Sequence, residues 1–260
     1  MTDELAAIRR PFTTVDLAPL LVDAEIDATV LVQTRSSLDE TREFLAAAGR
    51  TPFIRGVVGW VDLTDPAIAD VIAALDAAPG GDRLVGIRHQ VHDEPDPDWL
   101  LRNDVARGIR AVGAAGLVYD LLVRSRELPA ALELTRRQPE VRFVIDHLAK
   151  PPIRDSELHP WAALIRPFEA LDHVACKVSG MVTEADWTTW EPSDFAPYVD
   201  HALEVFGPDR LMFGSDWPVC LLAASYEQVV EAAHTTLARL SPAESAAVFG
   251  ETASTVYRLA

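Results

Sequence analysis

The chain has 260 residues, of which 49% are hydrophobic and 24% are charged, and these are the proportions of an ordinary globular domain. The length is typical of one α/β barrel, so we expect a single domain over residues 1–260. The net charge of −17 disfavours nucleic acid and anionic membranes as partners, because both would repel the chain. No apolar run approaches the ~20 residues of a membrane span, and the first residues, MTDELAAIRR, lack the apolar core of a secretory signal. The two cysteines, Cys176 and Cys220, form no recognisable motif, so we expect free thiols in a cytoplasmic protein.

Short runs rich in β-branched residues alternate with longer stretches of helical periodicity, and this alternation predicts parallel βα units. The predicted strands span residues 29–33, 54–60, 84–88, 117–121, 142–147, 174–179 and 211–214. The predicted helices span residues 16–24, 39–48, 67–77, 105–114, 128–137, 161–171, 195–206 and 226–240. A last helix is expected over residues 243–249, followed by a short segment that ends at Arg258.

The strand count is compatible with two α/β fold classes. A closed TIM-type (β/α)8 barrel needs eight parallel strands, so this chain would be such a barrel lacking its first strand. The alternative is an open doubly wound sheet, in which a nucleotide-binding protein carries a glycine-rich phosphate loop after an early strand. Gly56, Gly59, Gly80 and Gly81 fit no such loop. We therefore favour the TIM-type barrel with seven βα units in the chain.

Polar residues stand at the carboxyl ends of nearly all the predicted strands. The residues concerned are Gln33, Asp62, Arg88, His89, Asp120, Asp146, His147, Lys177, Ser179 and Asp216. Ionisable groups on apolar strands are costly to bury unless they share a polar cavity. Because the chemistry of α/β barrels is carried at this end of the strands, the pattern predicts an active site there.

His147 and Asp216 are the candidate catalytic residues. Neighbouring side chains of a strand point to opposite faces, so only one of Asp146 and His147 is expected to face the barrel mouth. We assign His147 to the site and expect Asp146 to brace the backbone, while a structural role for His147 is the alternative. Asp216 follows the last predicted strand and is suited to take a proton from water, with a helix N-cap as its alternative role.

Six further residues are candidates for substrate binding, namely Arg88, His89, His92, Lys177, Ser179 and Trp217. The guanidinium of Arg88 suits a carboxylate or a carbonyl oxygen, and a buried ion pair with Asp62 or Asp120 is its alternative. Lys177 and Ser179 share one face of their strand, with a neutralised core lysine as the alternative for Lys177. His92 is expected on a loop over the mouth, and Trp217 stands beside Asp216, where it can stack on a ring.

The chain resembles the lactonase branch of the amidohydrolase superfamily in four segments, which in chain order are GIRHQVHDEPDPDWLLR, FVIDHLAKPPI, CKVSGMVTEADW and FGPDRLMFGSDWPVC. This branch contains sugar-acid lactonases of the fuconolactonase type and is related to pyrone-dicarboxylate lactonase. The resemblance covers essentially the whole chain and implies a (β/α)8 barrel that hydrolyses a lactone ring. It also implies that Asp216 is the base and that His147 is a metal ligand or oxyanion partner. For Arg88 and Lys177 it implies contacts with substrate.

One departure from the family concerns the metal. The family opens with a strand that bears an H-x-H pair, and no H-x-H occurs in these 260 residues. His147 and Asp216 are the ligands that remain, too few for a tight zinc site. We therefore expect a divalent, zinc-like metal to be compatible with the site but not required, with weak or absent binding. The seven predicted strands are also one fewer than the eight of a closed barrel. We therefore hypothesise that Met1 is a misassigned start and that the gene continues upstream. The alternative is a family member that lost its first strand.

The sequence thus predicts a hydrolase that opens the lactone ring of a sugar acid, or of a related small carboxylic acid, with base-activated water. One alternative is a metal-dependent decarboxylase of the same superfamily. Another is a non-catalytic barrel that only binds a ligand. The expected partner is a small-molecule substrate, with neither nucleic acid nor membrane, and a homo-oligomer is left open.

Overall fold

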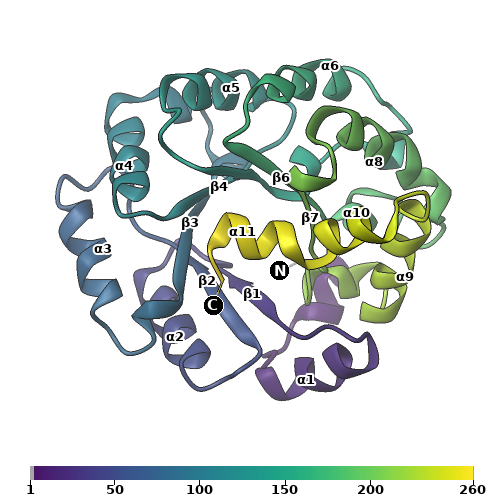
Figure 1. The fold of residues 1–260 in the computed structure, drawn as a ribbon, viewed down its shortest axis with the longest axis horizontal. Coiled ribbons are helices and arrows are strands. Elements are labelled where there is room, and N and C mark those ends of the chain that lie inside the picture. The colour runs from purple at the N-terminus through teal and green to yellow at the C-terminus, as the bar shows by residue number, and fades with distance from the viewer. Residues whose placement is uncertain (1–2, 260) are drawn as a thin grey trace.

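Parallel strands pair side by side, in the order of the chain, at the centre of the molecule (Figure 1). The computed structural model describes residues 3–259, so the prediction about Met1 lies outside the described residues. Within residues 3–259 the strands are β1 (Thr29–Val32), β2 (Ile54–Gly59), β3 (Leu84–Gln90), β4 (Val118–Leu122), β5 (Phe143–Ile145), β6 (Val174–Val178) and β7 (Leu211–Phe213). A doubly wound sheet reverses its strand order, and this sheet runs β1 to β7 without reversal. The TIM-type α/β class is therefore confirmed, with seven strands in a curled sheet.

Helices surround this sheet and connect its strands (Figure 1). They are α1 (Thr14–Asp23), α2 (Leu38–Ala48), α3 (Ile68–Asp76), α4 (Asn103–Ala114), α5 (Leu128–Arg137), α6 (Trp161–Ile165), α7 (Met181–Glu184), α8 (Pro192–Phe206) and α9 (Tyr226–Thr236). The helix predicted over 161–171 is broken, because Pro167 lacks a backbone N–H and the chain continues after Ile165 as a 3-10 helix (Arg166–Ala170). The short helix α7 was not predicted, since four residues show no periodicity.

Side chains alternate between the inside of the curled sheet and the helices outside it. On β4, Tyr119 and Leu121 pack in the outer core, whereas Val118 belongs to the cluster inside the barrel. The inner cluster consists of Val58, Val118, Val144, Ala175, Met212 and Tyr257. Following the same alternation, the next inward positions toward the carboxyl ends of β3, β4 and β6 are Arg88, Asp120 and Lys177. The lumen therefore changes from apolar to charged along its length.

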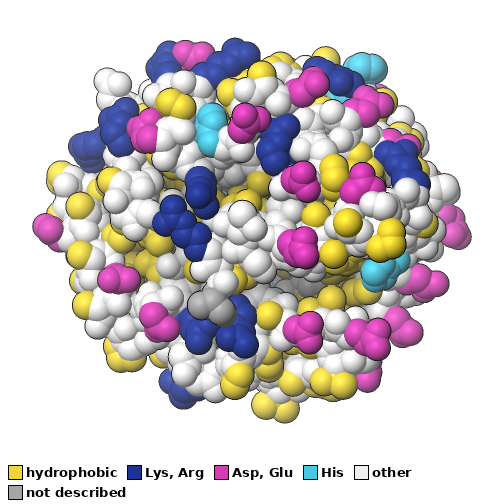
Figure 2. Space-filling view, in the orientation of Figure 1, with side chains coloured by type: hydrophobic (Ala, Val, Ile, Leu, Met, Phe, Trp, Pro, Cys, Tyr) yellow, Lys and Arg dark blue, Asp and Glu magenta, His cyan; other side chains and the backbone are white. Residues whose placement is uncertain are grey.

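The end of the chain covers the amino ends of the strands. Helix α10 (Pro242–Ala246), a π-helical turn (Ala247–Glu251) and α11 (Thr252–Tyr257) follow one another, so the helix predicted to end at residue 249 continues to Tyr257. Arg142, directly before β5, donates to the backbone carbonyls of Thr255 and Val256 at 3.4 Å. Helix α11 crosses the sheet on the face shown in Figure 2, where acidic and basic side chains are intermixed. The polar residues lie at the opposite end of the sheet, at the carboxyl ends of the strands, which the C-terminal helices do not cover.

Two global expectations can be compared with the structure. No helix within residues 3–259 is long and apolar enough to span a bilayer. Cys176 and Cys220 are both buried and form no disulfide.

Candidate active site

The backbone that carries His147 has an unusual conformation. Strand β5 ends at Ile145, and from His147 to Lys150 four consecutive non-glycine residues have positive φ angles of 52°, 53°, 58° and 51°. Each such residue costs about 1–2 kcal/mol relative to the right-handed region. Two hydrogen bonds hold the turn: the Trp161 indole N–H donates to the Leu148 carbonyl at 2.6 Å, and the Lys150 amide donates to the His147 carbonyl at 2.7 Å. We refer to residues 147–150 as the left-handed turn.

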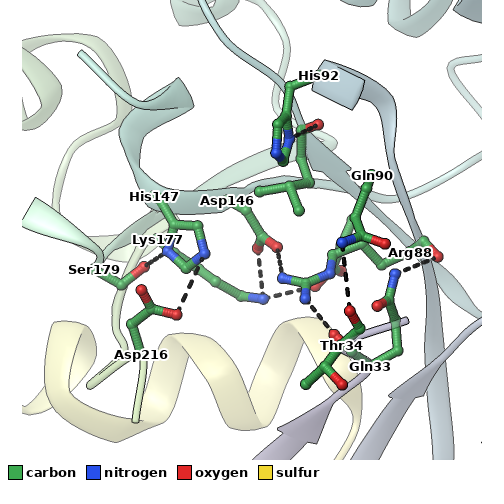
Figure 3. A network of polar contacts seen from close by, with 12 residues as sticks. Gln33, Thr34, Arg88, Gln90, His92, Asp146, His147, Lys177, Ser179 and Asp216 are labelled. Atoms are coloured by element: carbon green, nitrogen blue, oxygen red, sulfur yellow. Dashed lines mark hydrogen bonds and ion pairs between the residues drawn. The ribbon is translucent and has the colours of Figure 1, made fainter. Parts of the chain in front are cut away.

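The left-handed turn directs the imidazole of His147 toward two polar side chains (Figure 3). Its Nδ1 lies 2.7 Å from Oγ of Ser179, which fixes the ring orientation, and its Nε2 lies 3.7 Å from Oδ1 of Asp216. Burial lowers the pKa of His147 more strongly than the carboxylates of Asp216 and Asp146 raise it. The imidazole is therefore neutral at pH 7, with Nε2 facing the Asp216 carboxylate.

Asp216 also has a left-handed backbone, with φ of 55°. It follows β7, and its side chain is 16% exposed, which leaves the carboxylate accessible to a water molecule. The next 3-10 turn, Val219–Leu222, has no side-chain cap, so Asp216 does not serve as its N-cap. At 3.7 Å the His147–Asp216 pair is too long for a direct hydrogen bond, so a shared third partner can lie beside both groups.

A buried ion network lies next to this pair (Figure 3). Arg88 Nη1 is 2.7 Å from Asp146 Oδ2, and Lys177 Nζ is 2.6 Å from both Asp146 Oδ1 and Asp120 Oδ2. The hydroxyl of Tyr257 donates to the Asp120 carboxylate at 2.8 Å. Two cations and two carboxylates thus compensate one another where water is excluded. Removing one member would leave an uncompensated buried charge, which is strongly destabilising.

The role predicted for Asp146 is wrong. His147 was expected to face the mouth in place of Asp146, but Asp146 is in phase with the inward-facing Val144 of β5. His147 also reaches the site because the left-handed turn begins at this residue and alternation does not continue through a turn. Asp146 instead holds Arg88 and Lys177 within the site. Burial alone would raise the pKa of Asp146, and the charges of Lys177 and Arg88 outweigh it and hold this pKa well below its usual range.

Arg88 and Lys177 have their charges occupied by these carboxylates. Arg88 was weighed as an ion-pair partner of Asp62 or Asp120, and its observed carboxylate partner is Asp146, with a further hydrogen bond to the Gln33 carbonyl. Lys177 is 9% exposed and fully engaged in ion pairs. Direct contact of either side chain with substrate stays a prediction.

The structure places His89 outside this network. Trp60 Nε1 donates to His89 Nδ1 at 3.0 Å, Glu94 lies 2.8 Å from Nε2, and the ring stacks on Trp99 with 4.4 Å between centroids. Because Arg88 points into the lumen, the next residue of β3 points outward. His89 is therefore surrounded by protein partners, which favours a packing role over the predicted contact with substrate.

His92 and Trp217 lie on the loops that follow β3 and β7. Nδ1 of His92 is 3.4 Å from the Leu122 carbonyl, and burial lowers the pKa of His92. The Trp217 ring packs edge-on against Phe12 at 5.3 Å between centroids. Both remain candidates for substrate contact.

Two protein donors are positioned to share a metal ion. These donors are Nε2 of His147 and Oδ1 of Asp216. Two donors are fewer than the three or four protein ligands that zinc sites use. Residues 3–259 contain no group of three or more His, Cys, Asp or Glu side chains arranged to hold a metal. The donor types suit zinc, but their number falls short, so we derive no reaction step through a metal.

Comparison with known proteins identifies the family. The amidohydrolase family model matches residues 1–259. L-fucono-1,5-lactonase of Burkholderia multivorans is 40% identical over 266 residues, which cover 98% of this chain and 88% of the relative, and the L-fucono-1,5-lactonase of Burkholderia ambifaria is 40% identical over 226 residues, covering 85% and 75%. A crystal structure of an amidohydrolase from Burkholderia multivorans with bound zinc superimposes with a TM-score of 0.95 at 39% identity, covering 100% of this chain and 93% of that one. As the four sequence segments indicate, the chain belongs to the amidohydrolase family of hydrolases.

Proposed function

We propose that this protein hydrolyses the lactone ring of a sugar acid, with L-fucono-1,5-lactone as the first candidate substrate. The observation that carries the proposal is the pairing of His147 and Asp216, 3.7 Å apart, at the carboxyl ends of β5 and β7. The substrate is suggested by the 40% identity to two L-fucono-1,5-lactonases. The decarboxylase alternative is not favoured, because these relatives open lactone rings.

Asp216 is the group best suited to act as the base. Its carboxylate accepts a proton from water while the water oxygen forms a bond to the lactone carbonyl carbon. When the tetrahedral intermediate collapses, the bond from this carbon to the ring oxygen breaks. The proton on Asp216 then passes to the departing alkoxide, and the product is a hydroxy acid that loses its own proton to solvent.

The developing oxyanion needs a donor or a cation close to it. Arg88 and Lys177 lie nearby, but their charges are balanced by Asp146 and Asp120, so the network carries no net charge. This balance favours the neutral imidazole of His147 as the local polar partner. Lys177 and Arg88 then contribute to the reaction mainly by fixing the shape of the site.

We also propose that His147 and Asp216 are two of the ligands of a zinc ion, which these two residues alone would hold only weakly. The expectation that a metal is not required finds no support among the relatives, since the amidohydrolase at 39% identity carries zinc. A bound zinc ion supplies Lewis acidity to a carbonyl oxygen and lowers the pKa of water. We expect zinc added to chelator-treated protein to raise its activity and His147→Gln to prevent this rise. Full activity after chelation would restore the metal-free interpretation.

Acid release from L-fucono-1,5-lactone, followed with a pH indicator, tests the function. We expect Asp216→Asn to lower kcat by about 10²–10⁴-fold, because the proton acceptor is removed. Asp209→Asn is the control, since this exposed carboxylate lies at the opposite end of the same strand. Unchanged activity in Asp216→Asn would remove the proposed base, and a wild-type protein inactive on a panel of sugar-acid lactones would favour the non-catalytic alternative.

A small-molecule substrate is consistent with the lactonase relatives. The cytoplasmic location and the homo-oligomer stay predictions.

A further inference from the structure

We propose that Glu184 is a positioning residue that holds the imidazole of His147 in place through Lys150. The proposal rests on the function proposed above, because it assigns His147 to the reaction. Glu184 is the last residue of α7, and Lys150 is the last residue of the left-handed turn. Their contact closes the turn from the side of the neighbouring strand.

The Lys150–Glu184 ion pair is short and shielded. Lys150 Nζ lies 2.6 Å from Glu184 Oε1, and the two side chains are only 14% and 13% exposed. The other oxygen of Glu184, Oε2, lies 3.2 Å from Nη1 of Arg124. Arg124 follows β4, so one carboxylate connects the segments that follow β4, β5 and β6.

The chain after β6 contacts the left-handed turn at both of its ends. At the first residue, Ser179 Oγ lies 2.7 Å from His147 Nδ1, and at the last residue Glu184 binds Lys150. Ser179 and Glu184 are five positions apart on a continuous segment that includes α7. The turn is therefore held at two points, which restrains rotation of the strained backbone between them.

The charges of Glu184, Lys150 and Arg124 explain why the Lys150–Glu184 ion pair is stable. Burial alone would raise the pKa of Glu184, but Lys150 and Arg124 outweigh it and lower this pKa, so Glu184 is ionised at neutral pH. Without the carboxylate, two cations would face each other with no shared counter-ion. Lys150 would then turn toward solvent, and the backbone that carries His147 would lose a restraint.

A direct role in substrate recognition is less compatible with this geometry. Both carboxylate oxygens of Glu184 are already occupied, one by Lys150 and one by Arg124. Sugar hydroxyls would have to reach the remaining lone pairs of a side chain that is only 13% exposed and lies between two cations. Glu184 thus acts on the reaction through the left-handed turn.

Steady-state kinetics on the lactone that wild type hydrolyses separate these roles. We expect Glu184→Gln and Lys150→Met each to lower kcat by up to about 10–100-fold, the range found when an outer partner of a metal-ligating histidine is removed, with KM within about twofold of wild type. The double variant should be no slower than the slower single variant, because both changes break one contact. Glu133→Gln is the control: it removes an ion pair of 2.7 Å to Arg137 on α5, away from the site, and should leave kcat unchanged.

Imidazole 15N NMR gives a second measurement that does not require turnover. The His147 signals, assigned with His147→Gln, should shift in Glu184→Gln and return toward wild type in Glu184→Asp. A raised KM with unchanged kcat, or additive losses in the double variant, would overturn the positioning role. If wild type hydrolyses no lactone, the proposed function fails, and an unshifted His147 signal would separately refute the proposal for Glu184.

Discussion

Substituting Gly180 with alanine tests whether the position of His147 limits the reaction. Gly180 follows Ser179 and has φ of +64°, a conformation that costs alanine about 1–2 kcal/mol. An added Cβ would lie 2.8 Å from Cγ and 2.9 Å from Nδ1 of the imidazole, whereas ordinary contacts begin near 3.4 Å. The ring must therefore move by about 0.6 Å or more. Because a misplacement of about 1 Å can cost ~100-fold in rate, we expect kcat to fall about 10–100-fold.

The assay is lactone hydrolysis, with urea unfolding measured in parallel. Gly116→Ala is the matched control, since its φ is +78° and its added Cβ would meet only Arg258 Nη1, at 3.5 Å. Both variants should lose free energy of unfolding, Gly180→Ala more because its Cβ also overlaps the imidazole, and at equal folded fraction only Gly180→Ala should lose activity. Equal activity in the two variants at equal folded fraction would refute the reasoning, because displacement of the imidazole would then have no consequence.

Three further predictions concern the groups around this imidazole. Ser179→Ala should lower kcat about 10–100-fold by freeing the ring, and Ser179→Thr should restore part of the loss in the same steady-state assay. Asp146→Asn should lower the free energy of unfolding by about 3–5 kcal/mol in urea, because Arg88 and Lys177 lose a shared counter-ion. Burial raises the pKa of Asp120 to about 6, although Lys177 opposes this, so the folded protein holds the proton more tightly than the unfolded chain. The stability of wild type relative to Asp120→Asn should therefore decline by about 3 kcal/mol as pH rises from about 4 to about 6 and stay level above; a difference that grows with pH would contradict the raised pKa.

Local patterns in the sequence predicted the strands and the end of the sheet that carries the polar groups. Each predicted strand corresponds to an observed one, with ends displaced by a few residues at most, because β-branched runs bounded by turns are a local signal. Alternation correctly predicted that Lys177 of β6 and Ser179, directly after β6, point to the same side. The expectation that only one of Asp146 and His147 faces the mouth was wrong, since nothing local shows the left-handed turn that brings His147 to the same site as Asp146.

Partners far apart in the chain could not be predicted. Tyr257 contacts Asp120 across 137 positions, and no spacing in the sequence connects the last helix to β4. Glu184 was missed for a related reason: an acidic residue in a short segment resembles any solvated side chain until Lys150 and Arg124 are seen beside it. A weak available signal was that Lys150 and Glu184 both fall within segments that resemble the lactonases.

The distribution of left-handed residues gives independent support to the site. A glycine at position 147 or 216 would adopt these φ angles without strain, so backbone shape alone does not explain a histidine and an aspartate there. Strained residues persist where their surroundings hold them, and such places cluster at functional sites. Within residues 3–259 eight non-glycine residues have positive φ, and His147 and Asp216 are two of them whose side chains approach each other to 3.7 Å. Strain retained at these two positions supports the proposal that their side chains carry out the reaction.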